Sequence, residues 1–369
     1  MNNNVQALRA LAAYGVVLHH MIFSLNPHVG AARFDIDFHM GATGVDVFFV
    51  ISGFIMAETT HRRSMSPAEF IQHRLARIVP VYWLLTVLTV TVAAAGFSLF
   101  GHSAISARAI VRALLFIPDI DAAGRVIAPI LFVGWTLNYE MLFYALFALC
   151  LFIPRSGLRL WAVCGAVVAL WLAGLLEPGN PYLAYWSKSI ILEFALGVAV
   201  WRISQASPAP PAAAAIIAAA AIMGLALPDL IPDGFLLRHK VLILAPAAAA
   251  LVYTVVSLET ARISVGDGAL RLQGDASYSL YLLHPFVLLA IGKLAIMSRL
   301  NTTTAGLCVT LMCMFSGAVI AATAFHLIVE RPLTRRIRIY AGRDRGRLDN
   351  RPLFRGLASA RSAIRDVLH

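Results

Sequence analysis

Charged residues are scarce in this chain. Asp, Glu, Lys and Arg make up 13% of its 369 residues, whereas 60% are hydrophobic. A soluble domain of this size would be about a quarter charged, because its surface must face water. The deficit excludes an ordinary soluble domain and indicates a chain whose surface mostly faces lipid.

Cysteine is also scarce, and the common nucleotide-binding motifs are absent. The four cysteines lie in apolar runs and form no C-x-x-C pair; they are Cys150, Cys164, Cys308 and Cys313. We expect buried small hydrophobic residues here, and neither a disulfide framework nor a metal site. No G-x-x-x-x-G-K-[ST] or G-x-G-x-x-G stretch occurs, so the usual signatures of P-loop and Rossmann proteins are missing.

What the chain has instead is a series of apolar runs of 17 to 25 residues. A helix of that length crosses the hydrocarbon core and satisfies its own backbone hydrogen bonds there. The runs do not alternate with period two, which argues against a β-barrel. The predicted spans are 6–25, 44–60, 78–98, 129–153, 159–176, 187–203, 212–228, 240–258, 277–297 and 305–329. The sequence therefore predicts an all-α, polytopic transmembrane bundle of about ten helices, with 104–117 as a short interfacial or re-entrant helix.

The distribution of positive charge predicts the orientation of this bundle. Ten spans put both termini on one side, and the segments on that side hold 20 Lys and Arg residues against 7 on the other. Positive residues favour the cytoplasmic side, so both termini are expected in the cytoplasm. Much of the net charge of +11 lies in an arginine-rich tail that follows the last span. We therefore predict a transmembrane domain at 1–332 and a basic cytoplasmic tail at 333–369, which would contact anionic lipid and not nucleic acid.

Arg9 and His20 lie on one face of the first predicted helix. Eleven residues bring an α-helix back to within about 20° of the same direction, about 16 Å further along. Arg9 would lie near the cytoplasmic mouth and His20 near mid-membrane, whereas His19 would point about 100° away. An ionisable residue at that depth costs about 2.5–3.5 kcal/mol and is a candidate functional residue. The pattern also fits a packing histidine with an orienting arginine, and spacing alone does not choose.

Two intramembrane carboxylates could assist such a histidine. Imidazole can take a proton from a hydroxyl and pass it to a leaving group, and a nearby carboxylate would hold its tautomer. Asp46 and Glu140 are the candidates, because both lie beside aromatic runs in spans that should run inward. Helix–helix hydrogen bonding is the alternative role for both.

Six motifs, in order along the chain, resemble the membrane-bound acyltransferase-3 family. They are residues 4–11 leading to His20, 44–54 (GVDVFFVISGF), 74–83 (RLARIVPVYW), 135–140 (WTLNYE), 277–285 (SYSLYLLHP) and 330–332 (ERP). The first matches the family hallmark of an Arg, ten residues and a His in the first helix. The resemblance favours Arg9 and His20 as functional residues over the structural alternative.

The resemblance implies an enzyme of the bacterial inner membrane. Members of the family transfer an acyl group, most often acetyl, from cytoplasmic acetyl-CoA to a glycan hydroxyl. The first helix and the short chain are most similar to members that O-acetylate exopolysaccharide repeat units. His20 would then be the general base or a transient acyl carrier, supported by Asp46 and Glu140.

The other motif residues are expected to bind the two substrates. Arg9, Arg74 and Arg77 would bind the phosphates of CoA, for which guanidinium groups are suited. The acceptor, a lipid-linked oligosaccharide, would approach from the other side; the expected substrate-binding residues are Ser52, Trp135, Tyr281 and His284. Two alternatives stay open: an acyltransferase acting on a small molecule or lipid, and a transporter or flippase of lipid-linked sugar. Transporters tend to show paired repeats, which we do not find in this sequence.

Overall fold

The computed structural model describes residues 2–25, 38–95, 105–121, 123–176, 179–231, 240–266 and 268–337. The long helices are α1 (Asn3–Leu25), α3 (Gly44–Arg62), α4 (Pro67–Ala94), α6 (Trp135–Cys150), α7 (Ser156–Leu176), α9 (Leu192–Ala206), α10 (Pro211–Leu230), α12 (Lys240–Thr260), α14 (Ser277–Met297) and α15 (Thr304–Phe325). The short helices are α2 (His39–Ala42), α5 (Ala107–Leu114), α8 (Pro181–Trp186) and α13 (Gly268–Asp275). The remaining elements are the 3-10 turns η1 (Phe132–Gly134), η2 (Ser189–Ile191) and η3 (Leu300–Thr302), the π-helical turn η4 (His326–Glu330), and the antiparallel strands β1 (Asp119–Ile120) and β2 (Val126–Ile127).

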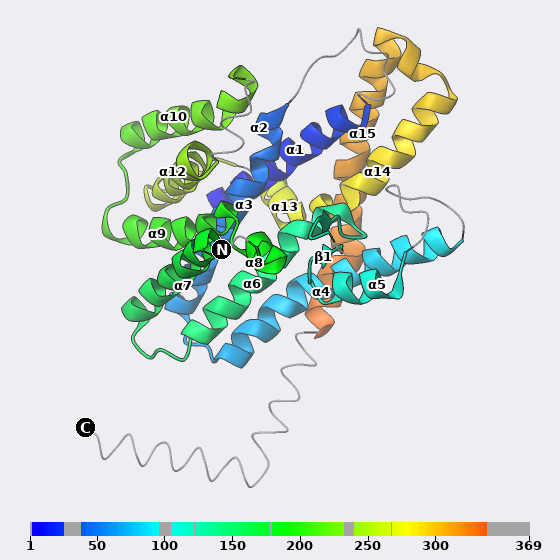
Figure 1. Ribbon diagram of the computed structural model, residues 1–369. Helices are drawn as coiled ribbons and strands as arrows, with labels where there is room; N and C mark the ends of the chain where they lie inside the picture. The colour runs from blue at the N-terminus through cyan, green and yellow to red at the C-terminus, as the bar shows by residue number, and fades with distance from the viewer. Residues whose placement is uncertain are drawn as a thin grey trace, which may run out of the picture.

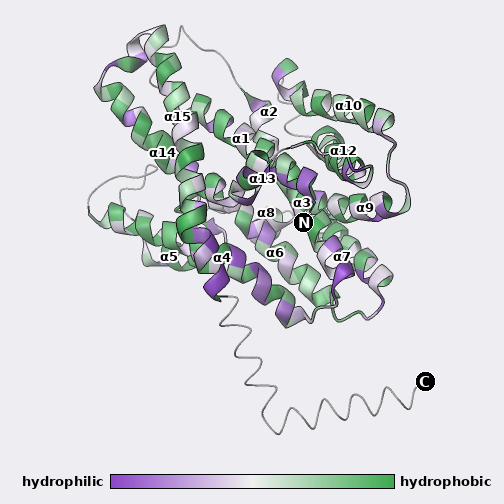
Figure 2. Ribbon diagram, turned by 180° about the vertical axis from the view of Figure 1, so that it is seen from behind, coloured by the Kyte–Doolittle hydropathy of each residue, from purple (hydrophilic) through white to green (hydrophobic). Residues whose placement is uncertain are grey.

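Within the described residues, ten helices with their flanking turns are long and apolar enough to cross a membrane. This confirms the predicted all-α bundle and its number of spans, and the protein is a multi-pass membrane protein. Apolar residues cover most of the length of these helices (Figure 2). The 8-residue α5 lies within the segment predicted as a short helix at 104–117, and it is not among the ten spans, as predicted.

The start of α4 differs most from the predicted boundaries. The helix begins at Pro67, about three turns earlier than expected. The Ser66 hydroxyl accepts a hydrogen bond from the Glu69 backbone N–H at 3.2 Å. Pro67 occupies the first helical position, where a missing N–H costs nothing. These first turns are too polar to register as an apolar run, and as a result Arg74 and Arg77 lie on a helix and not in its approach.

The central helix α1 packs against α3, α12, α13, α14 and α15 (Figure 1). A Cβ atom at Gly44 would lie 2.4 Å from the Ala12 carbonyl oxygen, so only glycine permits this approach of α3 to α1. Gly53 brings α3 equally close to α9, since a Cβ there would lie 2.1 Å from the Phe194 carbonyl oxygen. These two glycines therefore let α3 pack closely against α1 on one side and α9 on the other.

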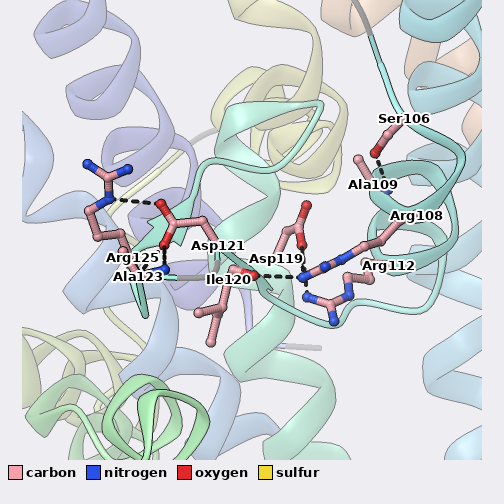
Figure 3. Close-up of polar contacts among 9 residues, drawn as sticks. All are labelled: Ser106, Arg108, Ala109, Arg112, Asp119, Ile120, Asp121, Ala123 and Arg125. Atoms are coloured by element: carbon pink, nitrogen blue, oxygen red, sulfur yellow. Dashed lines mark hydrogen bonds and ion pairs between the residues drawn. The ribbon is translucent and has the colours of Figure 1, made fainter.

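A small polar unit links α4 to α6. Arg112 and Arg108 of α5 reach the Asp119 carboxylate at 2.8 and 3.3 Å, as Figure 3 shows. Asp121 accepts hydrogen bonds from the backbone and the side chain of Arg125. These two hydrogen bonds hold the pKa of the Asp121 carboxyl below its ordinary value. The contacts order a segment in which the sequence shows no motif.

The cysteines are only partly as expected. All four are free thiols. Cys150 is buried and Cys164 half-buried, but Cys308 and Cys313 are exposed on α15, so the prediction of burial is wrong for these two. A lipid-facing helix surface is as apolar as a protein core, and sequence hydropathy does not distinguish them. The predicted basic tail lies outside the described residues from position 338 onward.

Candidate active site

Three arginines and one glutamate surround a cavity of about 90 Å³ between α1, α3, α4, α6 and α14. The charged residues are Arg9, Arg74, Arg77 and Glu140. Arg9 and Arg74 are 6% and 9% exposed, and Arg77 is half-buried. We call this space the arginine cavity. The structure thus brings together the three arginines expected to bind the donor, in a lining with surplus positive charge.

Arg9 is held by a chain of polar side chains. One of its terminal nitrogens donates to Gln6 Oε1 at 2.9 Å, and Gln6 Nε2 donates to Asp275 Oδ1 at 2.5 Å. Arg9 also interacts electrostatically with Glu330 and Glu140. A buried guanidinium costs several kcal/mol unless it is paired. The hydrogen bonds through Gln6 therefore fix Arg9 at the cavity, and the three carboxylates offset part of the cost of its burial beside Arg77.

Glu140 lies with the arginines. Its Oε1 accepts hydrogen bonds from the Tyr144 hydroxyl, one turn along α6, and from the Ser52 hydroxyl of α3 at 3.4 Å. It also lies within electrostatic range of Arg9. The structure thus joins Glu140 and Ser52 at the arginine cavity, and neither is among the contacts described for the His20 ring.

Tyr281 connects the arginine cavity to the next part of the site. It lines the cavity, and its hydroxyl lies 3.0 Å from both the Thr136 hydroxyl and the Val133 carbonyl oxygen. Its ring centroid lies 6.2 Å from that of His284, three residues further along α14. Tyr281 and His284 therefore connect the arginine cavity to the His20 region along one helix, α14.

His20 and His284 form a pair in the protein interior. His284 Nε2 lies 3.3 Å from His20 Nδ1, and the ring centroids are 5.0 Å apart. His284 is fully buried, His20 is half-buried, and the Phe132 ring packs against His20 at 5.4 Å. Pro285 directly follows His284 inside α14 and has no N–H for the Tyr281 carbonyl. The helix thus lacks one backbone hydrogen bond beside the pair.

Backbone carbonyls one turn earlier set the tautomers of both rings. His20 Nδ1 lies 2.9 Å from the Val16 carbonyl oxygen, and His284 Nδ1 lies 3.1 Å from that of Leu280. A carbonyl oxygen only accepts, so each neutral ring is assigned its proton on Nδ1 from these partner atoms. His20 Nε2 keeps a lone pair that can take a proton. Among the described contacts, backbone carbonyls therefore hold the ring where a carboxylate was expected.

Asp46, Trp135 and His19 lie elsewhere. Asp46 is fully buried in the first turn of α3 and is not among the residues that line the arginine cavity. Trp135 begins α6, and its ring packs against the next turn of that helix. His19 Nδ1 lies 2.8 Å from the Phe38 carbonyl oxygen, next to α2, whereas His20 faces α14. The two neighbouring histidines thus diverge, as the helical period predicts.

Sequence patterns contain little signal for the carboxylates that balance the arginines. Asp275 lies 269 positions after Gln6 and belongs to none of the six motifs. Glu330 does open the ERP motif, and its Oε2 accepts hydrogen bonds from Ser279 at 2.5 Å and from His326 Nδ1 at 2.8 Å. The motif marked the position of Glu330 but not its electrostatic interaction with α1. Among the described residues, no group of three or more His, Cys, Asp or Glu side chains could hold a metal ion.

Known proteins similar to this chain include acyltransferases. A family model described as an acyltransferase domain matches residues 2–326. The exopolysaccharide production protein ExoZ of Rhizobium meliloti is 39% identical over 307 residues, which cover 81% of this chain and 91% of that protein. The acyltransferase MdmB of Streptomyces mycarofaciens is 26% identical over 363 residues, covering 88% and 89%. Nodulation protein 10 of Rhizobium leguminosarum bv. viciae is 30% identical over 223 residues, covering 53% and 58%. No solved structure matches the chain.

Proposed function

This chain belongs to the acyltransferase family, as its motifs predicted, and from that premise we propose that it moves an acetyl group from acetyl-CoA to a hydroxyl of an exopolysaccharide repeat unit at the bacterial inner membrane. The relative named for exopolysaccharide production, similar over most of both chains, supports a glycan acceptor. The observation that carries the proposal is the continuous run of side chains from the arginine cavity through Tyr281 to the His284–His20 pair. This run of side chains places a site for an anion next to a proton acceptor in the protein interior.

In this proposal the arginine cavity binds the acyl donor. CoA carries phosphates, and the planar guanidinium groups of Arg74 and Arg77 present paired donors to phosphate oxygens. At about 90 Å³ the cavity is small beside the roughly 300–1,000 Å³ of a typical ligand pocket. It is therefore assigned to the narrow pantetheine arm, and Arg74 and Arg77 meet the phosphates that adjoin this arm, with Arg77, the least buried of the three arginines, nearer the surface. Arg9 keeps the opposite wall positive.

His20 is assigned the chemical step. Its Nε2 lone pair takes the proton of the acceptor hydroxyl while the hydroxyl oxygen attacks the thioester carbonyl carbon. The C–S bond then breaks, and the imidazolium returns the proton to the leaving thiolate, so that CoA departs as the thiol. In a two-step route the same lone pair would attack the thioester carbon and expel the CoA thiolate; the acceptor hydroxyl oxygen would then take the acyl group from Nε2, and its proton would pass to that thiolate.

His284 is assigned the positioning of His20. Because its own Nδ1–H is directed at the Leu280 carbonyl, its Nε2 faces His20 Nδ1 as an acceptor. The His20 Nδ1–H then has two acceptors, the Val16 carbonyl and His284, when the ring becomes positive. A hydrogen bond to a charged group contributes about 1.5–3 kcal/mol. His284 would thus do what the sequence suggested for a carboxylate.

The acceptor is assigned to the end of the bundle at which α3 and α6 begin. Phe132, against the His20 ring, and Trp135 lie next to each other at the start of α6. Aromatic walls with a few polar groups are typical of small-molecule sites. The two substrates would thus reach His20 from opposite ends.

Replacing His20 tests this assignment. The O-acetyl content of the exopolysaccharide and the membrane abundance of the protein are measured in the same cells. Loss of a general base costs about 10²–10⁴-fold in rate, so His20→Ala should remove acetylation at normal abundance. His19→Ala is the matched control, because its ring bonds to Phe38 and not to His284, and it should retain acetylation.

Two outcomes would sink the proposal. Undiminished acetylation in His20→Ala at normal abundance would remove His20 from the chemistry. An unchanged glycan mass in a strain lacking the gene, together with loss of an acylated small molecule, would place the acceptor in another class.

A further inference from the structure

A second cavity, of about 440 Å³, lies between the end of α3, the start of α7 and the end of α9. Successive spans alternate in direction, so this is the end of the bundle at which α1 begins. The cavity shares no lining residue with the arginine cavity. Its basic lining residues are His61, Arg159 and Arg202, and no carboxylate is among the described residues that line it. We call it the α7 cavity.

The positive charge of the α7 cavity is not neutralised from within the described part of the chain. Arg202 is exposed and makes no hydrogen bond or ion pair with the described residues. The nearby Glu58 is already engaged, since it accepts from Trp201 Nε1 at 2.6 Å and pairs with Arg62 at 2.5 Å. Arg159 donates to the Ile153 carbonyl and so is held in place at the cavity. A fixed cation and an open one therefore face the same space.

The first turn of α7 also favours an anion in the α7 cavity. Ser156 and Gly157, its first two residues, line the cavity. Backbone N–H groups at a helix N-terminus have no intrahelical partner and carry partial positive charge, which favours anions. This feature and the two arginines point to the same ligand charge.

The other walls of the α7 cavity are apolar and open towards the membrane. Leu160, Trp161 and Val198 line it. Trp161 is 74% exposed, and α7 is the least buried of the ten candidate spans. Tryptophan is enriched at the level of lipid headgroups. The cavity therefore combines cationic groups at the membrane surface with apolar walls that run into the hydrocarbon region.

From this combination we propose that the α7 cavity binds an anionic phospholipid, with the phosphate on Arg202 and Arg159 and an acyl chain along Leu160 and Trp161. Basic pockets between transmembrane helices are suited to acidic lipid headgroups. A soluble anion would leave the apolar walls without a partner, and a neutral lipid would leave Arg202 without one. The site is separate from the proposed acyl transfer and does not depend on it.

The test uses the full-length purified protein and measures retained lipid by native mass spectrometry. The probes are phosphatidylglycerol and phosphatidylcholine vesicles, with inorganic phosphate and CoA as competitors. The wild-type protein should retain phosphatidylglycerol in preference to phosphatidylcholine. Arg202→Gln should bind phosphatidylglycerol about fivefold more weakly, the usual effect of one basic residue at a lipid surface. Arg155→Gln is the control, because Arg155 lies just before α7 but does not line the cavity, and it should bind normally.

A steric variant tests the cavity without changing charge. A Cβ atom at Gly157 meets nothing within 4 Å, so Gly157→Leu adds bulk to the lining of the cavity at an open position. It should reduce phosphatidylglycerol retention and leave the unfolding temperature in lipid-free detergent unchanged. Gly165→Leu, also open and on α7 but outside the cavity, should retain the lipid.

Three results would overturn the proposal. Equal retention of the two phospholipids would show that charge plays no part. Displacement of phosphatidylglycerol by inorganic phosphate alone would make this a free-anion site. Displacement by CoA, abolished in Arg202→Gln, would assign the α7 cavity to the acyl donor.

Discussion

The arginine cavity and the His20–His284 pair meet on α14, yet they are held by opposite means. The cavity contains permanent charges whose partners come from α6, α13 and η4. The histidines bond to each other and to backbone carbonyls of their own helices. Permanent charge suits the binding of an anion, whereas an uncharged ring can take up and release a proton. Donor binding and proton transfer are thus assigned to two separate but adjoining regions of the protein interior.

The separation has a physical reason. A carboxylate in direct contact with His20 would favour the imidazolium form and so occupy the Nε2 lone pair with a proton. Among the described contacts, no carboxylate meets the ring: its neighbours are the Val16 carbonyl, His284, His19 and Phe132. Four substitutions test this separation of donor binding from proton transfer.

Gly53→Leu should have the largest effect, because it displaces α3, which lines the arginine cavity and packs against α1, the helix of His20. A Cβ atom at Gly53 would lie 2.1 Å from the Phe194 carbonyl oxygen, so α3 must move away from α9. Overpacking of this kind costs about 1–3 kcal/mol and sometimes more. Membrane abundance, thermal unfolding and donor binding should all fall. Gly165→Leu, at an open position on α7, is the control, and normal behaviour of Gly53→Leu would contradict the close packing.

His284→Ala should slow acetyl transfer without weakening the binding of the donor. The loss of one hydrogen bond to a charged ring predicts a decrease in kcat of about 10- to 100-fold, with the KM for acetyl-CoA unchanged. His284→Gln should recover part of the rate, because its amide oxygen can accept from His20 Nδ1. The double variant with His20→Ala should be no slower than His20→Ala alone. Additive losses would mean that His284 acts independently.

Arg74→Gln should weaken donor binding and leave the rate of transfer nearly unchanged. The guanidinium lines the arginine cavity and lies 5.4 Å from the centre of the Phe70 ring, where Gln cannot replace its charge. Loss of one charge-assisted hydrogen bond to phosphate predicts an increase in the Kd for acetyl-CoA of about tenfold, with kcat nearly normal at saturation. Arg155→Gln, outside the cavity, serves as the control. An equal loss of donor and glycan binding would indicate misfolding.

Glu140→Gln should have the smallest effect. The amide oxygen can still accept from Ser52 and Tyr144, and removal of the negative charge leaves the arginine cavity more positive. We expect donor affinity to be unchanged or higher and kcat to change by less than about threefold. Steady-state kinetics with acetyl-CoA measure both. A loss as large as that of His20→Ala would restore Glu140 to the catalytic role suggested by the sequence.

The fold could be predicted because its signals are local. Ten apolar runs give ten spans, since the membrane requires each helix to satisfy its own backbone. The exception is α4, whose polar first turns resemble a loop until Ser66 and Pro67 are read as a helix start. Hydropathy likewise could not show that Cys308 and Cys313 face outward.

The site could be predicted only in part, because its partners are remote in sequence. The helical period placed Arg9 and His20 towards one side, and both do face α14. It could not predict that Asp275 and Glu330 interact with Arg9, or that His284 and not a carboxylate meets His20. Those pairings depend on how α13, α14 and η4 pack against α1, which no local pattern records.

The central claim is that the arginine cavity binds the donor and His20 performs the transfer. The most direct test is a single-turnover measurement of acetyl transfer at saturating acetyl-CoA, made on His20→Ala and Arg74→Gln side by side. We predict that Arg74→Gln reacts at nearly the wild-type rate once the donor is saturating. His20→Ala should bind the donor normally and react about 10²–10⁴-fold more slowly. A fast His20→Ala enzyme, or an Arg74→Gln enzyme that stays slow at saturation, would contradict the account.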